Sequence, residues 1–403
     1  MRSSTRRSLL PVLAVALSAV VVAAPAAAAS KRSPKSRIKN IVVVMMENRS
    51  FDHLLGWHPT ADARQEGLAF PDGFGGTQLS YHLTDFQGCG HPEPDHSWEG
   101  GRAEYADGMM NGFLTAGDND AFAIGYYTEQ DRPFTSALAR NFTTLDRFFA
   151  SILGPTFPNR MFLYAAQTDR LENSADLSTL PTIFDRLLEK GVNVKYYRSD
   201  LSFLALWGGK YAPIVSTYPQ FLAAAAAGKL PQVSFVEPRF VGDAIGIGGS
   251  DHPYSDIREG DAFLSRTFRA VAGGADWPGT VFIVIYDEWG GFFDHVAPPR
   301  AAAPNDVDPD VVDGKALLGF RVPAIVASPF TRGNPDAPRV DSTVFDHTSV
   351  LKLIEWRFGL APLTARDASD DVGNLLDALD LESYDPAVPD LPEAVSPRPH
   401  LCP

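Results

Sequence analysis

The feature that most constrains the fold is an unbroken apolar run that passes directly into a polar cluster. Residues 41–46 are Ile, Val, Val, Val, Met and Met, and Glu47-Asn48-Arg49-Ser50-Phe51-Asp52-His53 follows. Such a run is typical of a strand that is buried on both faces in the centre of a parallel sheet. The carboxyl ends of these strands face the crevice in which α/β proteins bind ligands. Acid, amide, arginine and histidine side chains are costly to bury there unless something binds them, so we predict a functional site.

Helix and strand signals alternate along the rest of the chain. We expect strands at 192–197, 233–236, 280–286 and 322–327, and helices at 181–190, 259–272 and 348–358. This alternation favours an α/β fold with a mostly parallel central sheet flanked by helices. Residues 57–131 are rich in Gly, Pro, Asp and His and predict a loop-rich cap, whereas 367–403 predict an acidic, proline-rich surface tail.

Residues 1–29 have the layout of a secretory signal peptide. Three arginines precede an apolar stretch at 9–24, small residues follow it, and the Arg6-Arg7 pair resembles a twin-arginine signal. We therefore expect a secreted or cell-envelope protein, exported by the twin-arginine route, with one catalytic domain at 30–403. An uncleaved membrane anchor is the alternative, and no later segment is long enough to span a bilayer.

The charge of the chain limits the classes of partner that it can bind. The net charge is −14, and without residues 1–29 it becomes −17, because 32 basic residues face 49 acidic ones. This balance argues against nucleic acid and leaves at most transient contact with a membrane surface. No obligate protein partner is indicated.

Cys89 and Cys402 predict a disulfide that links the tail to the body of the protein. The alternative is that they are two unrelated thiols.

Acidic side chains follow two of the expected buried strands. Glu47-Asn48 follows the first, and Asp287-Glu288 follows the run at 280–286. In a parallel sheet these ends lie at the same edge, so four oxygen donors can converge there. Oxygen ligands of this kind suit one divalent cation. The alternative is that each pair is an ordinary polar strand end.

A turn at 153–160 precedes a further helical pattern. Thr156 is expected at or near the helix N-cap, where backbone N–H groups and the helix dipole favour negative charge. Its hydroxyl could act as a nucleophile if a metal lowers its pKa, although a simple capping role is the alternative. We assign Asn159 and Arg160 to substrate binding. Arg160, like Arg49, could equally pair with a buried carboxylate.

Five histidines each follow an aspartate: His53, His96, His252, His295 and His347. A neighbouring carboxylate can orient an imidazole or raise its pKa, as general acids and metal sites require. We take His96, His252 and His295 as catalytic candidates, with structural hydrogen bonding as the alternative for each. His347 could simply begin a helix.

Together these motifs resemble the bacterial phosphoesterase family that contains non-haemolytic-type phospholipases C and secreted acid phosphatases. The residues that carry the resemblance lie at 47–53, 154–160, 251–253, 286–296 and 345–349. The resemblance implies an alkaline-phosphatase-like fold and a metal held by Glu47, Asn48, Asp287, Glu288 and the hydroxyl of Thr156. Relatives carry serine or threonine at the last position. It also implies that His96, His252 and His295 surround the phosphoryl group.

The expected function is metal-dependent hydrolysis of phosphoric esters. Phospholipase C acting on a phospholipid through a threonine nucleophile is the first expectation, and acid phosphatase acting on soluble monoesters is the alternative. A non-catalytic exported protein that binds phosphate or a metal is the third possibility. A lipase would need an exposed apolar rim, for which Leu54, Leu55 and Trp57 are candidates, although core packing is the other fate of such residues.

Overall fold

The computed structural model describes residues 34–402, so the predicted signal peptide at 1–29 lies outside the described residues. Within them, the largest sheet has eight strands. In spatial order these are β15 (Val340–Asp341), β6 (Thr143–Leu145), β14 (Ala324–Ala327), β10 (Thr280–Tyr286), β1 (Asn40–Met46), β9 (Val233–Val236), β7 (Val194–Arg198) and β8 (Val215–Thr217). Strands β10, β1, β9, β7 and β8 are parallel, whereas β14 is antiparallel to both of its neighbours. The predicted mostly parallel α/β fold is confirmed.

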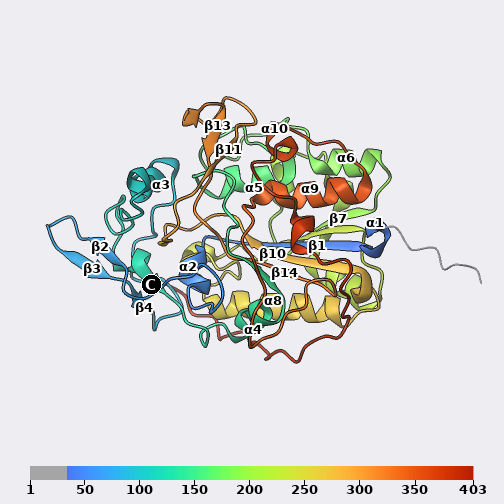
Figure 1. Cartoon of the computed structure of the whole chain (residues 1–403), viewed down its shortest axis with the longest axis horizontal. Coiled ribbons are helices and arrows are strands. Elements are labelled where there is room, and N and C mark those ends of the chain that lie inside the picture. Colours follow the sequence, from blue (N-terminus) through green and yellow to red (C-terminus); the bar gives the residue numbers. More distant parts are fainter. Residues whose placement is uncertain (1–33, 403) are drawn as a thin grey trace, which may run out of the picture. The chain divides into compact units, whose positions relative to one another are not determined.

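Strand β1 lies between β10 and β9, and all seven of its residues are buried. Its pairing with β10 places Met46 opposite Tyr286, so the two strands end at the same level (Figure 1). The residues that follow, Glu47 and Asp287, therefore emerge together at one edge of the sheet. The local apolar patterns predicted this arrangement.

Helices cover both faces of the sheet (Figure 1). One face carries α5 (Thr156–Ala165), α6 (Ile183–Glu189), α9 (His347–Phe358) and α10 (Ala365–Ala368). The other carries α4 (Pro133–Asn141) and α8 (Ile257–Ala272), and α7 (Tyr218–Ala226) packs on α8. Helix α9 begins with a capping box between Asp346 and Ser349 and ends at Gly359, whose φ of +66° favours glycine. The helical layers enclose the sheet and leave its carboxyl edge for the site.

The remaining elements are short. They are α1 (Pro34–Arg37), α2 (Phe51–Leu55), the hairpin β2 (Ala69–Pro71) and β3 (Thr77–Leu79), the pair β4 (Tyr81–His82) and β5 (Gly125–Tyr126), α3 (Trp98–Tyr105), and a sheet of β11 (Arg300–Ala302), β13 (Lys315–Leu317) and β12 (Val311–Val312). Single 3₁₀ turns occupy Ala106–Gly108, Ala121–Ile124, Phe203–Trp207, Ala212–Ile214, Asp243–Ile245, Trp277–Gly279 and Leu375–Ala378.

The expected loop-rich segment at 57–131 contains one helix that the sequence pattern did not predict, α3. Gly100 and Gly101 lie inside it, and glycine lowers helix propensity. The structure explains both, because a Cβ would come within 2.2 Å of Asp95 at Gly100, and within 2.8 Å of Leu153 and 2.9 Å of Trp289 at Gly101. Close packing therefore requires a residue that disfavours the helix. Helix α3 and the β2–β3 hairpin lie beyond the carboxyl end of β1 (Figure 1).

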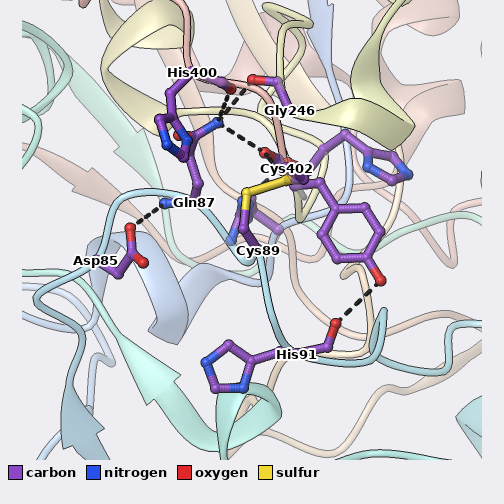
Figure 2. The surroundings of a disulfide bond; sticks show 10 residues. Asp85, Gln87, Cys89, His91, Gly246, His400 and Cys402 are labelled. Atoms are coloured by element: carbon purple, nitrogen blue, oxygen red, sulfur yellow. Dashed lines mark hydrogen bonds between the residues drawn. A yellow bond between two sulfur atoms is a disulfide. The ribbon is translucent and has the colours of Figure 1, made fainter.

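The predicted disulfide between Cys89 and Cys402 is present, and it joins residues 313 positions apart. The Gln87 side chain donates to the backbone oxygen of Gly246 at 2.8 Å (Figure 2). The Cys402 N–H donates to Ile245 O at 3.0 Å. The end of the tail is therefore fastened to two loops, one around residue 89 and the other around residue 246.

The apolar residues beside the first motif do not form a surface rim. Leu54 and Leu55 are buried in the main core, and Trp57 packs against that core. Leu54 and Leu55 belong to α2, which turns them inward, and Trp57 follows just after this helix, so all three pack in or against the core. Among the helices at 34–402, none combines the length and the apolar character needed to cross a bilayer.

Candidate active site

The ends of β1 and β10 are tied together by hydrogen bonds. Asn48 has a φ of +57°, a left-handed conformation that asparagine tolerates better than most residues. Its backbone N–H donates to Asp287 Oδ1 at 3.0 Å, and its side-chain amide donates to Glu288 Oε1. The predicted convergence of Glu47, Asn48, Asp287 and Glu288 is therefore built into the backbone geometry of the two strand ends.

The three acids at this edge are buried close to one another. Burial raises the pKa of Glu47 well above its ordinary value, and Asp287 adds to the rise, although Arg160 acts in the opposite direction. Burial is the largest cause that raises the pKa of Glu288, and repulsion from Asp287 is the second. The cluster is thus short of positive charge.

Arg160 supplies part of that charge. Its guanidinium is fully buried and contacts three carboxylates: Asp287 Oδ2 at 3.0 Å, Glu237 Oε2 at 2.6 Å and Glu47 Oε1 at 3.3 Å. These contacts make Arg160 an internal counter-ion of the acidic cluster. Its assignment to substrate binding stays a prediction, and the contacts seen here describe a positioning role.

The donor set fits a divalent cation. Arg160 contacts three carboxylates, those of Glu47, Glu237 and Asp287, and Glu288 adds a fourth, so negative charge remains in excess. In addition, Asn48 Oδ1 is buried and has no hydrogen-bond partner among residues 34–402. Surplus carboxylates and a free amide oxygen are what a hard cation binds. A bound cation would satisfy both features at once.

Thr156 is the first residue of α5, directly after Pro155 at the N-cap. It is only 6% exposed. The next backbone N–H, that of Phe157, donates to Asn173 Oδ1 at 2.8 Å. The prediction that Thr156 starts a helix is confirmed, and one of the first-turn N–H groups is already used by the protein.

Asn159 fixes the turn that carries Thr156. Its side-chain NH₂ donates to the backbone oxygens of Ile152, Gly154 and Pro155 at 3.1, 2.8 and 3.2 Å, and its Oδ1 accepts from Ile152 N at 3.1 Å. The side chain is fully buried. Its assigned role in substrate binding stays a prediction, while these contacts make Asn159 a positioning residue for Thr156.

A cavity of about 570 Å³ brings several of the predicted residues together. Glu47, Thr156, His252 and Asp243 line it, and the rest of its wall is mostly apolar. Apolar lining residues are Phe157, Ala175, Leu201, Phe203, Ala205, Leu206, Phe240 and Ala244. A predicted nucleophile, a predicted metal ligand and a predicted general acid therefore share one partly apolar cavity.

His252 and His96 both face Glu93. His252 Nε2 lies 3.1 Å from Glu93 Oε1, and His96 Nε2 lies 3.7 Å from the same oxygen. Burial alone would raise the pKa of Glu93, but the hydrogen bond from His252 and the charges of both histidines lower it overall. Arg49 holds the loop from behind, because its guanidinium donates to the backbone oxygens of Asp251 and His252 at 2.6 and 3.2 Å. No sequence pattern marked Glu93, which lies between two prolines outside any regular element.

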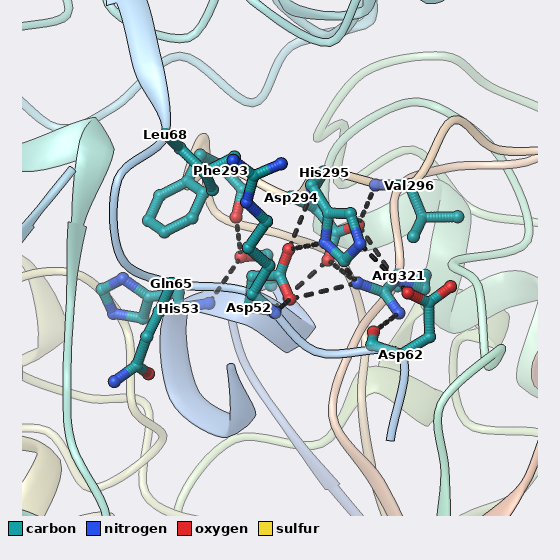
Figure 3. A network of polar contacts seen from close by, with 12 residues as sticks. Asp52, His53, Asp62, Gln65, Leu68, Phe293, Asp294, His295, Val296 and Arg321 are labelled. Carbon is teal, nitrogen blue, oxygen red and sulfur yellow. Dashed lines mark hydrogen bonds and ion pairs between the residues drawn. The ribbon is translucent and has the colours of Figure 1, made fainter. Parts of the chain in front are cut away.

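His295 belongs to a different network (Figure 3). Its Nδ1 contacts Asp52 Oδ2 and its Nε2 lies 3.2 Å from Asp62 Oδ1. Burial lowers its pKa, but the hydrogen bond and the charge of Asp52 outweigh burial and raise it overall. His295 does not line the cavity that contains Thr156. Its catalytic assignment stays a prediction.

Asp52, Asp294 and His295 could also hold a metal ion, because one ligand atom from each lies within 4.8 Å of the others. A fully buried arginine already occupies this cluster, however. Arg321 pairs with Asp52 at 3.1 Å and with Asp294 at 2.9 Å (Figure 3). Arg321 thus counters the charge of these carboxylates, as Arg160 does in the Glu47 cluster, and a metal held by the Glu47 cluster stays a prediction.

His347 has a structural environment. Its Nε2 lies 2.9 Å from the backbone oxygen of Tyr286, and its Nδ1 lies 3.1 Å from Ser151 Oγ. Burial lowers the pKa of His347 from 6.5 to about 4. The neutral ring therefore fixes the end of β10 immediately before Asp287.

This environment predicts acid sensitivity. The pKa of His347 is about 4 in the folded protein and 6.5 in the unfolded chain. Between these values the unfolded chain binds a proton that the folded protein does not, so the free energy of unfolding falls as pH decreases. We expect this residue to account for a loss of about 3 kcal/mol between about pH 7 and about pH 4. Urea denaturation of the wild type and of His347→Gln at both pH values measures it. Equal losses in the two proteins would contradict the assignment.

The profile of the Phosphoesterase family matches residues 38–361, which include every predicted site residue. The chain belongs to this family. It is 32% identical to non-specific phospholipase C6 of Arabidopsis thaliana, over 83% of this chain and 71% of the relative. It is 31% identical to phospholipase C A of Mycobacterium tuberculosis, over 80% of this chain and 73% of that relative. It is also 31% identical to phospholipase C B of the same organism, over 90% of this chain and 81% of that relative. The protein is a phosphoric ester hydrolase, as predicted.

Solved structures of similar arrangement include a protein of the alkaline phosphatase superfamily from Vibrio parahaemolyticus. Its TM-score is 0.42 at 12% identity, over 84% of this chain and 70% of its own. The lipoteichoic acid synthase of Listeria monocytogenes has a TM-score of 0.43 at 9% identity, over 83% of this chain and 76% of its own.

Proposed function

We propose that this phosphoesterase is a metal-dependent phospholipase C that uses Thr156 as its nucleophile. The observation that carries the proposal is the shared cavity, in which Thr156, Glu47 and His252 adjoin a mostly apolar wall. An ester whose leaving alcohol is apolar fits such a wall better than a small, fully hydrated monoester does. The names of the relatives at about 30% identity support the same substrate class.

The reaction would proceed in two displacements. A divalent cation held by Glu47, Asn48, Asp287 and Glu288 would lower the pKa of the attacking hydroxyl and neutralise phosphoryl oxygens. The Thr156 hydroxyl gives its proton to solvent water, and its oxygen forms a bond to phosphorus while the bond from phosphorus to the lipid oxygen breaks. A proton from His252 passes to the departing alcohol.

Water completes the cycle. It attacks phosphorus, the bond to the Thr156 oxygen breaks, and the threonine regains its proton as the phosphorylated headgroup leaves. Deprotonated His252 can accept the proton of that water, which restores its starting state. Glu93 Oε1 lies 3.1 Å from His252 Nε2 and would hold the imidazole in place for both steps.

We further propose that the protein acts outside the cytoplasm. The signal-like residues 1–29 support export, and a disulfide between Cys89 and Cys402 persists in oxidising compartments.

A substrate panel tests the proposal. Purified protein lacking residues 1–29 should release phosphocholine from phosphatidylcholine faster than it releases phosphate from a soluble aryl monoester. A chelator should abolish turnover, and adding back a divalent cation should restore it. Faster cleavage of the monoester would favour an acid phosphatase, and full activity in excess chelator would contradict metal dependence.

A further inference from the structure

Three exposed apolar side chains lie on the segments that line the cavity containing Thr156. Leu201 lines the cavity and is 57% exposed, Val241 directly follows the lining residue Phe240 and is 56% exposed, and Ile245 directly follows Ala244 and is 49% exposed. We call Leu201, Val241 and Ile245 the apolar rim. Large apolar side chains at this exposure cost free energy in water unless they contact another apolar phase.

The backbone of the apolar rim is held in place. The Asp200 carboxylate accepts hydrogen bonds from Val241 N at 2.7 Å and from Leu201 N at 2.5 Å, and so fastens two rim residues to each other. The backbone oxygen of Ile245 accepts from Cys402 N, beside the disulfide to Cys89 (Figure 2). Because these loops are already ordered, little conformational entropy remains to be lost when the rim binds something.

We infer that the apolar rim docks on the surface of a phospholipid bilayer, an inference that rests on the proposed function. Leu201 of the rim lines the cavity, and the chain neighbours of Val241 and Ile245 supply further apolar wall, so a lipid docked on the rim would lie beside the cavity. Electrostatic attraction does not drive this contact, because the chain carries a charge of −14 and two acids, Asp200 and Asp243, adjoin the rim. The surface it fits is therefore a zwitterionic one, reached by apolar insertion.

Vesicle binding of the intact protein tests this surface separately from catalysis. The rim variant is Val241→Gln with Ile245→Gln, two residues that do not line the cavity. The control variant is Phe74→Gln with Val312→Gln, apolar residues that are 97% and 52% exposed and lie outside the cavity wall. Binding is measured by sedimentation with phosphatidylcholine vesicles, and turnover is measured in parallel on a soluble aryl phosphocholine diester.

We expect the rim variant to bind the vesicles about tenfold more weakly than the wild type, with unchanged turnover of the soluble diester. The control variant should bind as the wild type does. Equal binding by wild type and rim variant, equal loss in both variants, or no binding by the wild type would each overturn the inference. Failure of the proposed function looks different, because the wild type would then cleave no phosphocholine diester, whether or not the rim binds vesicles.

Discussion

Replacing Thr156 with alanine should lower kcat for phosphoric ester hydrolysis by at least about a thousandfold. The side chain lies at the first position of α5 and lines the same cavity as Glu47 and His252. Alanine is a good helix former, and Thr156 is not the N-cap residue, so the fold should tolerate the change. The loss should therefore appear in kcat and leave the thermal midpoint within a few degrees of the wild type.

Thr156→Ser provides the matched control. It keeps a hydroxyl at the same backbone position and removes one methyl group, so most of the activity should remain. Steady-state kinetics on phosphatidylcholine, with circular dichroism to check folding, measure both variants. If the alanine variant kept near-wild-type activity, Thr156 would be only a residue of the helix start, which is the alternative that its position also allows.

Arg160→Gln should lower the free energy of unfolding by about 4 kcal/mol. The guanidinium is fully buried and is within 3.3 Å of carboxylate oxygens of Glu47, Glu237 and Asp287. Removing it leaves these acids without their internal counter-ion, and an uncompensated buried charge is far more costly than a lost surface pair. Urea denaturation at neutral pH measures the loss.

Arg258→Gln is the control for this change. Arg258 also pairs with a carboxylate, Asp256, at 2.6 Å, but its side chain is 45% exposed. Its replacement should cost less than about 1 kcal/mol, because solvent screens an exposed ion pair. An effect of Arg160→Gln confined to KM, with stability like that of the Arg258 variant, would instead support the assignment of Arg160 to substrate binding.

The parts of the structure that were predictable are those specified by short, continuous patterns. The apolar runs before Glu47 and Asp287 predicted two central parallel strands, and their equal ends follow from the register of β1 with β10. The turn before Thr156 likewise predicted the start of α5. Each of these signals depends on neighbours in sequence, which is why sequence alone was sufficient.

What sequence did not predict depends on contacts between distant segments. Glu93 matters because the fold brings it to His252, 159 positions later, and nothing in its own surroundings marks it. Arg321 pairs with Asp52 across 269 positions. Periodicity carries no information about such pairings, so the polar partners of Arg160, Arg321 and the histidines emerge only from the folded chain.

The stereochemical course at phosphorus tests the central claim most directly. Each in-line displacement inverts phosphorus, so attack by Thr156 followed by attack of water gives overall retention. The wild-type enzyme is given a phosphocholine diester made chiral by one sulfur atom, in water enriched with heavy oxygen, and the configuration of the product is determined. We expect retention. Inversion would mean that water attacks the substrate directly and would contradict a threonine nucleophile.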